Sequence, residues 1–132
     1  MSAVKNDLIN RLPLHDRTRL LALCEPVPLL LSQVLCEPDA PTTHVYFPTQ
    51  GFISLVSQVD AHPGLEVGMV GREGMVGVQV VLGLVDLPLQ VLVQGQGAAL
   101  RVPVQPFMDE LALSPAMKKY FDRYAFVRLA QT

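Results

Sequence analysis

Short apolar runs, separated by residues that favour turns, fill the middle of this chain and constrain its fold more than any other feature. The turn-forming segments include Pro38–Pro41, Gln50–Gly51, Asp60–Gly64 and Gly95–Gly97. Many short strands at such spacing are typical of a β-sandwich or barrel. No helical pattern separates consecutive runs, which argues against a parallel, doubly wound sheet. The runs are Val27–Leu31, Gln33–Cys36, His44–Phe47, Phe52–Gln58, Leu65–Val70, Leu89–Gln94 and Ala98–Val102.

Before these runs, the sequence favours two short helices. Asn6 or Asp7 can cap a first amphipathic turn, which Pro13 ends. A second helix is predicted over about Asp16 to Leu23, and the prolines that begin at Pro26 stop it. A helical lead-in of about 25 residues therefore precedes the strands.

The last thirty residues return to a helical pattern. A short helix is predicted over Gln105–Leu113, followed by Ser114-Pro115, which places a hydroxyl at the N-cap and a proline at the first helical position. The final helix is predicted from Ala116 to at least Gln131. Its apolar stripe fits packing on its own domain and pairing with a partner helix equally well, because two heptads are too few to decide. The stripe consists of Met117, Tyr120, Phe121, Tyr124 and Val127.

Composition limits the class of protein. The chain has 132 residues, 50% of them hydrophobic and 17% charged, which fits one domain with a packed core. A net charge of −2 argues against nucleic-acid binding by this domain itself. The sequence has no apolar run long enough to span a bilayer, and its first residues lack the apolar region of a secretory signal. These features predict a cytoplasmic domain.

The residue pattern does not indicate a metal site or an enzyme. Cys24 and Cys36 lie twelve positions apart without a Cys-x-x-Cys motif or a nearby histidine, so free thiols are expected. The acidic residues are scattered, and no nucleophile lies in a pattern that suggests a base beside it. No cofactor, metal or catalytic residue is predicted.

The segment Val70–Gly77, with the sequence VGREGMVG, is the most distinctive motif. Its glycines recur at every third position, and an Arg-Glu pair carries its charge. Such a loop can present backbone N–H groups to an anion, because glycine permits unusual torsions and close approach. It lacks the Gly-Lys-Ser/Thr of a Walker loop. A structural loop and a phosphate-binding loop both remain open from the spacing.

Three segments together carry a resemblance to a known family: VLCEPDAPTTHVYFPTQGFISLV (Val34–Val56), EVGMVGREGMVG (Glu66–Gly77) and LVQGQGAALRVPVQPF (Leu92–Phe107). With a long final helix after them, the chain resembles the N-terminal sensor domain of the Crp/Fnr family of bacterial transcription regulators. The resemblance implies a mainly β fold with flanking helices, a double-stranded β-helix (β-roll, jelly-roll type) of eight antiparallel strands. It implies one cyclic-nucleotide-binding-like domain: a lead-in over 1–25, the β-roll over 26–103 and C-terminal helices over 104–132.

The chain departs from the family at the ligand anchors. The family's pocket uses a Gly-Glu pair for the ribose and an Arg-Ser/Thr-Ala triplet for the cyclic phosphate. Here the glycine falls on Gly77, the glutamate on Val78, and the triplet on Leu89-Gln90-Val91. A buried phosphate without a cationic partner is strongly disfavoured, so the usual mode of cyclic-nucleotide binding is not expected. The candidate ligand-binding residues are Gly71, Arg72, Glu73, Gly74, Gly77, Val78, Leu89 and Gln90.

The resemblance implies a regulatory small-molecule-sensing domain of a bacterial transcription regulator, with a degenerate nucleotide pocket. It also implies a homodimer through the stripe of the final helix. The alternative is a stand-alone β-roll module for interaction or dimerisation that binds no nucleotide, which the apolar Val78 and Leu89 favour. Family regulators continue into a helix-turn-helix, and the sequence up to Thr132 contains no recognition helix. DNA would therefore be bound only through a missing C-terminal domain or a partner.

Overall fold

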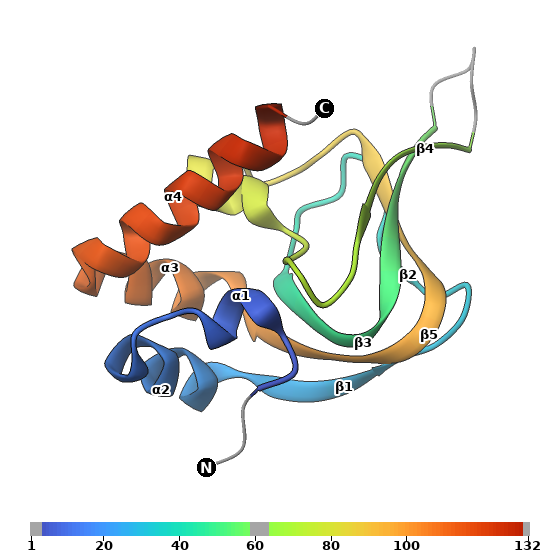
Figure 1. The fold of residues 1–132 in the computed structure, drawn as a ribbon. Helices are drawn as coiled ribbons and strands as arrows, with labels where there is room; N and C mark the ends of the chain where they lie inside the picture. Colours follow the sequence, from blue (N-terminus) through green and yellow to red (C-terminus); the bar gives the residue numbers. More distant parts are fainter. Residues whose placement is uncertain (1–3, 59–63, 131–132) are drawn as a thin grey trace.

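An antiparallel sheet with helices gathered beside it makes up the fold (Figure 1). The computed structural model describes residues 4–58 and 64–130. The strands of this part are β1 (Glu25–Leu29), β2 (Val34–Cys36), β3 (His44–Ser57), β4 (Leu65–Val70) and β5 (Leu89–Pro103). The helices are α1 (Asp7–Asn10), α2 (Leu14–Leu23), the 3₁₀ helix η1 (Val78–Leu82), α3 (Val104–Leu113) and α4 (Pro115–Ala130). No described helix is long and apolar enough to cross a membrane.

The sheet confirms the predicted fold class. Its strand order is β1-β5-β3-β4, with β2 also paired to β5, and every pairing is antiparallel. The sheet is strongly curved but not closed, and β3 and β5 form its long central pair (Figure 1). The helices α1 to α4 lie together on one side of it.

The prediction of eight strands is wrong, because the described residues form five. Gln50–Gly51 and Gly95–Gly97 were expected to be turns, yet β3 and β5 run through them without ending. The pairing of β3 with β5 shifts register at these points, so the strands bend through bulges. Glycine permits this continuity, since Gly51 has a φ of 80°. The predicted turn at Asp60–Gly64 lies, up to residue 63, outside the described residues.

Asn6 ties the N-terminal helices to the sheet, and it is the N-cap of α1, one of the two residues predicted for that role. Its side-chain oxygen accepts a hydrogen bond from the backbone N–H of Ile9 at 3.0 Å. Its side-chain NH₂ donates to the carbonyl oxygens of Pro48 and Gly74, both at 2.9 Å. Asn6 is fully buried, and these three hydrogen bonds satisfy its amide group without water.

Helix α2 begins at Leu14, two residues before the predicted start.

Helix α4 is anchored to the rest of the domain by an aromatic cluster and a cap. Phe121 of α4 packs edge-on against Phe107 of α3 and Phe47 of β3, with ring centroids 5.2 and 6.2 Å apart. All three rings are fully buried. The Ser114 hydroxyl accepts a hydrogen bond from the Met117 backbone N–H at 3.2 Å, which confirms the predicted N-cap. The predicted end of this helix at Gln131 lies outside the described residues.

Candidate ligand-binding site

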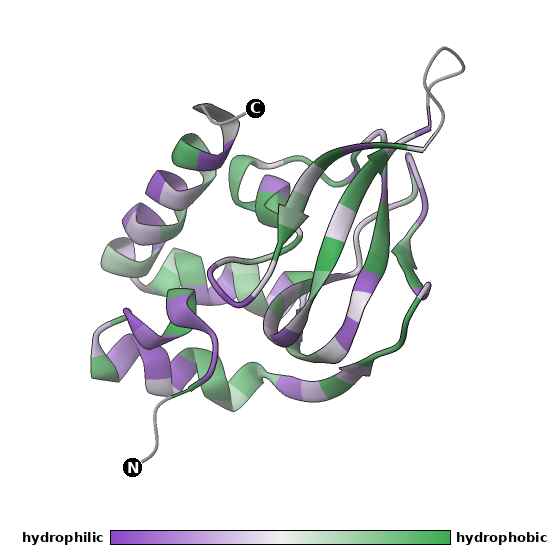
Figure 2. Ribbon diagram, turned by 45° about the vertical axis from the view of Figure 1, so that its right-hand side comes forward, coloured by the Kyte–Doolittle hydropathy of each residue, from purple (hydrophilic) through white to green (hydrophobic). Residues whose placement is uncertain are grey.

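A cavity of about 390 Å³ lies between the sheet and helix α4. Strands β3 and β4, the 3₁₀ helix η1, the segment that leads into β5, and α4 all contribute to its wall. Most of the lining is aliphatic, and Figure 2 shows η1 as mostly hydrophobic. Among the described residues that line it, only Gln79 and Arg128 carry polar side chains. A volume of this size suits a small organic molecule.

Val78 and Leu89, two of the predicted ligand-binding residues, both line this cavity. Val78 is the first residue of η1 and Leu89 is the first residue of β5. These are the positions where the family resemblance places the ribose and phosphate anchors. Each position presents an aliphatic side chain, which offers a phosphate or a hydroxyl group no hydrogen bond.

Gly77 shapes the entry into η1, because its φ of 95° turns the chain from the loop into the helix. A Cβ atom at this position would lie 3.0 Å from Cγ1 of Val45, so a larger residue would be strained and crowded. Segment 71–77 thus leads into the short helix η1. Gly77 lines a second, smaller cavity of about 20 Å³ rather than the larger one.

The remaining predicted residues of the loop are held by its own backbone and by the N-terminus. The Glu73 carboxylate accepts a hydrogen bond from the Gly71 N–H at 3.0 Å, and the carbonyl oxygen of Arg72 accepts one from the Asp7 N–H at 2.7 Å. None of Gly71, Arg72, Glu73 and Gly74 lines the larger cavity. We therefore leave these four residues out of the proposed site.

The side chain of Gln90 forms hydrogen bonds with residues that do not line the cavity. Its side-chain oxygen accepts a hydrogen bond from Gln58 at 3.2 Å, and its side-chain nitrogen donates to Glu37 at 3.1 Å. It does not line the larger cavity, although its neighbour Leu89 does. Alternation along a strand explains this difference, since successive side chains point to opposite faces. Gln90 is therefore also left out of the proposed site.

The glycine loop is joined to α4 through Tyr124. The Tyr124 hydroxyl accepts a hydrogen bond from the Met75 backbone N–H at 3.1 Å. A Cβ atom on Gly74 would lie 2.2 Å from this hydroxyl oxygen, which explains why a glycine stands there. Burial raises the pKa of Tyr124, because desolvation disfavours the phenolate, so the hydroxyl stays protonated at neutral pH.

The predicted stripe of α4 divides into an inner and an outer part. Met117 and Phe121 are fully buried within their own chain, so these two residues cannot form a seam with a partner. The Tyr120 hydroxyl donates to the carbonyl oxygen of Leu8 at 2.6 Å, which occupies this side chain as well. Val127 is 44% exposed, and its neighbour Phe126, which the stripe did not include, is 72% exposed.

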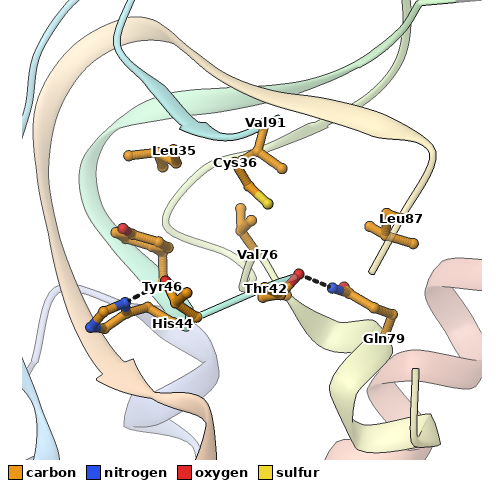
Figure 3. A pocket seen from close by; sticks show the side chains of 11 residues that line it. Leu35, Cys36, Thr42, His44, Tyr46, Val76, Gln79, Leu87 and Val91 are labelled. Carbon is orange, nitrogen blue, oxygen red and sulfur yellow. Dashed lines mark hydrogen bonds between the residues drawn. The ribbon is translucent and has the colours of Figure 1, made fainter. Parts of the chain in front are cut away.

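Gln79 also lines the larger cavity, although it was not among the residues predicted from the sequence. It lines both cavities and is only 6% exposed. In the smaller cavity, which Figure 3 draws, its side-chain nitrogen donates to the Thr42 hydroxyl at 2.8 Å. Its side-chain oxygen has no hydrogen-bond partner among the described residues. Thr42 can satisfy only one of the two polar atoms of the amide. A buried polar atom without a partner is costly, so this amide suits a ligand or a water molecule.

The two thiols take no part in the larger cavity. Cys24 and Cys36 are both free, as predicted, and both are half-buried. Burial raises the pKa of Cys24 to about 12, which keeps its thiol protonated and unreactive. Within the ranges 4–58 and 64–130, no three His, Cys, Asp or Glu residues are grouped as metal ligands would be.

The fold has known counterparts among bacterial regulators. The catabolite activator protein of Thermus thermophilus is similar with a TM-score of 0.77 at 11% identity, over 95% of this chain and 59% of that one. The N-terminal domain of a transcriptional regulator from Streptomyces coelicolor has a TM-score of 0.74 at 15% identity, over 98% and 92% of the two chains. The sensor domain of the regulator DNR from Pseudomonas aeruginosa has a TM-score of 0.74 at 12% identity, over 95% and 84%.

This chain has the fold of a regulator sensor domain. The predicted resemblance is thus confirmed at the level of the fold, and putative cyclic-nucleotide-binding proteins are also among the similar structures. No protein-family model matches the sequence, and a comparison with curated proteins gives no significant match. The sensor-domain fold accounts for nearly all of this chain but for only about three-fifths of a regulator such as the Thermus protein.

Proposed function

We propose that residues 1–132 form the small-molecule-sensing domain of a Crp/Fnr-type bacterial transcription regulator, with a pocket that has lost the anchors for a cyclic nucleotide. This proposal rests on the cavity beside α4, where Val78 and Leu89 stand at the positions expected for the polar anchors. The similar structures support a regulatory role, because they are regulators and their sensor domains. DNA would be bound by a segment or partner outside these residues.

Two contacts of α4 support a route for the signal. Ala125 of α4 lines the cavity directly, and the preceding residue, Tyr124, bonds the loop that enters η1. A ligand in the cavity therefore touches both α4 and η1, which pack on one another. We infer that occupancy changes the position or the stability of α4, which transmits the change to the rest of the regulator.

A stand-alone interaction module is the second candidate. The segment between η1 and β5 exposes apolar side chains, including Leu84, which lines the cavity, and its neighbour Val85. Exposed apolar groups of this kind are common in protein-binding surfaces. In this alternative the cavity takes no small molecule, and its rim contacts a protein.

A ligand screen separates the two candidates. We expect small apolar metabolites to raise the melting temperature of the chain and cyclic AMP at 1 mM to leave it unchanged. A ligand present at 100 times its dissociation constant adds about 2.7 kcal/mol of stability, which a melting curve detects easily. Ala125→Phe fills the cavity from α4 and should abolish the shift, with circular dichroism confirming its fold. Micromolar binding of cyclic AMP would overturn the degenerate pocket, and a screen without any hit would favour the interaction module.

We further propose that α4 forms a homodimer through its exposed outer face. Phe126→Glu should lower the sedimenting mass from dimer to monomer while circular dichroism shows the monomer still folded, since Phe126 is outside the core. Leu113→Glu is the matched control, because Leu113 is 68% exposed at the end of α3, and it should leave the mass unchanged. Equal masses for the wild type and Phe126→Glu, where the wild type is dimeric, would exclude this face.

A further inference from the structure

Arg128 is the single charged side chain among the described residues that line the larger cavity. It lies in the last turn of α4, and its guanidinium donates to the carbonyl oxygen of Met69 on β4 at 3.5 Å. This long hydrogen bond uses one of its five N–H donors. The ion pairs of the described residues join Arg19 to Glu110, Arg101 to Glu25, and Lys118 to Asp122, so none of them includes Arg128.

The guanidinium is directed toward the strand side of the cavity rather than toward the end of its own helix. Its Nη2 atom lies 3.8 Å from the place where a Cβ atom on Gly68 would stand, beside the bond to Met69. The absence of a side chain at Gly68 leaves room next to the guanidinium. An unpaired cation with free donors at the edge of an apolar cavity is suited to a carboxylate, which accepts two parallel hydrogen bonds from it.

Gln79 is the other polar residue of the wall, and its unpartnered atom is the side-chain oxygen, which only accepts hydrogen bonds and so gives a carboxylate no anchor. It belongs to η1, whereas Arg128 belongs to α4, and apolar side chains make up the rest of the cavity wall. The wall therefore offers one cation, one neutral amide and otherwise only hydrocarbon. A nucleotide would bury several ribose and base hydrogen-bonding groups without partners in such a wall, which is costly.

We propose that the cavity binds an amphipathic monocarboxylic acid, with the carboxylate held by Arg128 and an uncharged apolar body against the aliphatic wall. This inference rests on the proposed sensing function and adds the chemical class of the effector. Because Arg128 belongs to α4 and contacts β4, a bound carboxylate engages the helix that carries the signal. A ligand of the same shape without the charge fills the cavity but does not engage this helix residue.

Three probes with the same eight-carbon chain test the proposal on the full chain: octanoate, 1-octanol and octylamine. We expect calorimetry to show octanoate binding about 10- to 100-fold more tightly than 1-octanol, the range that a charge-assisted hydrogen bond provides. Octylamine should bind no more tightly than 1-octanol. Arg128→Gln should lower the affinity for octanoate to the affinity for 1-octanol. Arg123→Gln is the control, since Arg123 is an exposed cation of the same helix that does not line the cavity.

The outcomes separate this inference from the proposed function. If 1-octanol binds as tightly as octanoate, the protein does not recognise the carboxylate, but the proposal that the cavity binds an apolar effector is retained. If Arg128→Gln, shown by circular dichroism to be folded, keeps the preference for octanoate, Arg128 is not the anchor. If octanoate does not bind the wild type at 1 mM, the monocarboxylate class is overturned. The metabolite screen with Ala125→Phe then decides the sensing function independently.

Discussion

Phe121→Ala is expected to lower the free energy of unfolding by about 3–5 kcal/mol, the usual cost of truncating a fully buried phenylalanine. Phe121 has no exposed surface, and its ring packs against Phe47 and Phe107 with edge-on geometry. The truncation therefore removes buried apolar area, leaves a cavity and breaks two aromatic contacts. Urea denaturation of the full chain, followed by circular dichroism, measures the change.

The same helix offers a matched control in Phe126, which is largely exposed. Phe126→Ala should change the stability of the monomer by less than about 0.5 kcal/mol, as surface substitutions usually do. The comparison tests which face of α4 belongs to the core. A loss of less than about 1 kcal/mol for Phe121→Ala would contradict the packing of α4 against α3 and β3.

Much of this fold could be predicted from local sequence patterns. The strand Leu65–Val70 has the predicted bounds. Ser114 caps the start of α4, because a hydroxyl and a following proline define a helix start within a few residues. Asn6 was one of two candidates for the first cap, and only its contacts with Pro48 and Gly74 show why it is buried. Those partners are 42 and 68 residues away, and no local pattern specifies them.

The candidate site could be predicted only in part, for a similar reason. Val78 and Leu89 were found because the family resemblance fixed their register, and both line the cavity. Arg72 and Glu73 were predicted to bind a ligand because they are the charged pair of a glycine-rich loop. The sequence could not show that Glu73 bonds its own loop at Gly71. Arg128 was not among the predicted site residues, because its position at the cavity depends on how α4 packs.

These placements indicate how one fold can carry different ligand chemistry. The glycine turn at Gly77 sets the start of η1, which forms part of the cavity wall, while the side chains of Val78 and Leu89 make that wall apolar. Because the polar anchors and the backbone that shapes the pocket are different atoms, the first can be lost without loss of the second. In our proposal, Arg128 of α4 then supplies the one cation of the cavity wall, so that a carboxylate becomes the ligand group that the pocket selects.

Gly51→Ala is the second substitution for which we expect a large effect, a loss of about 3 kcal/mol or more in the free energy of unfolding. Two costs add at this position. Its φ of 80° is a left-handed conformation, which costs a residue with a Cβ atom about 1–2 kcal/mol. The Cβ atom would also lie 2.2 Å from the carbonyl oxygen of Gly95 and 2.7 Å from that of Gln96. Forced overpacking of this kind costs about 1–3 kcal/mol.

Gly83→Ala separates these two costs, because Gly83 has a φ of 85° but no atom within 4 Å of its added Cβ. It should lose only about 1–2 kcal/mol, from the backbone conformation alone. The difference between the two variants in urea denaturation then measures how closely β5 passes β3 at the bend. The contacts at Gly51 involve backbone atoms, which cannot rotate away as a side chain can, so the bend itself must open. Equal losses for the two variants would show that β3 and β5 are not in close contact there, and the strands would then be interrupted at the bend, as in an eight-stranded arrangement.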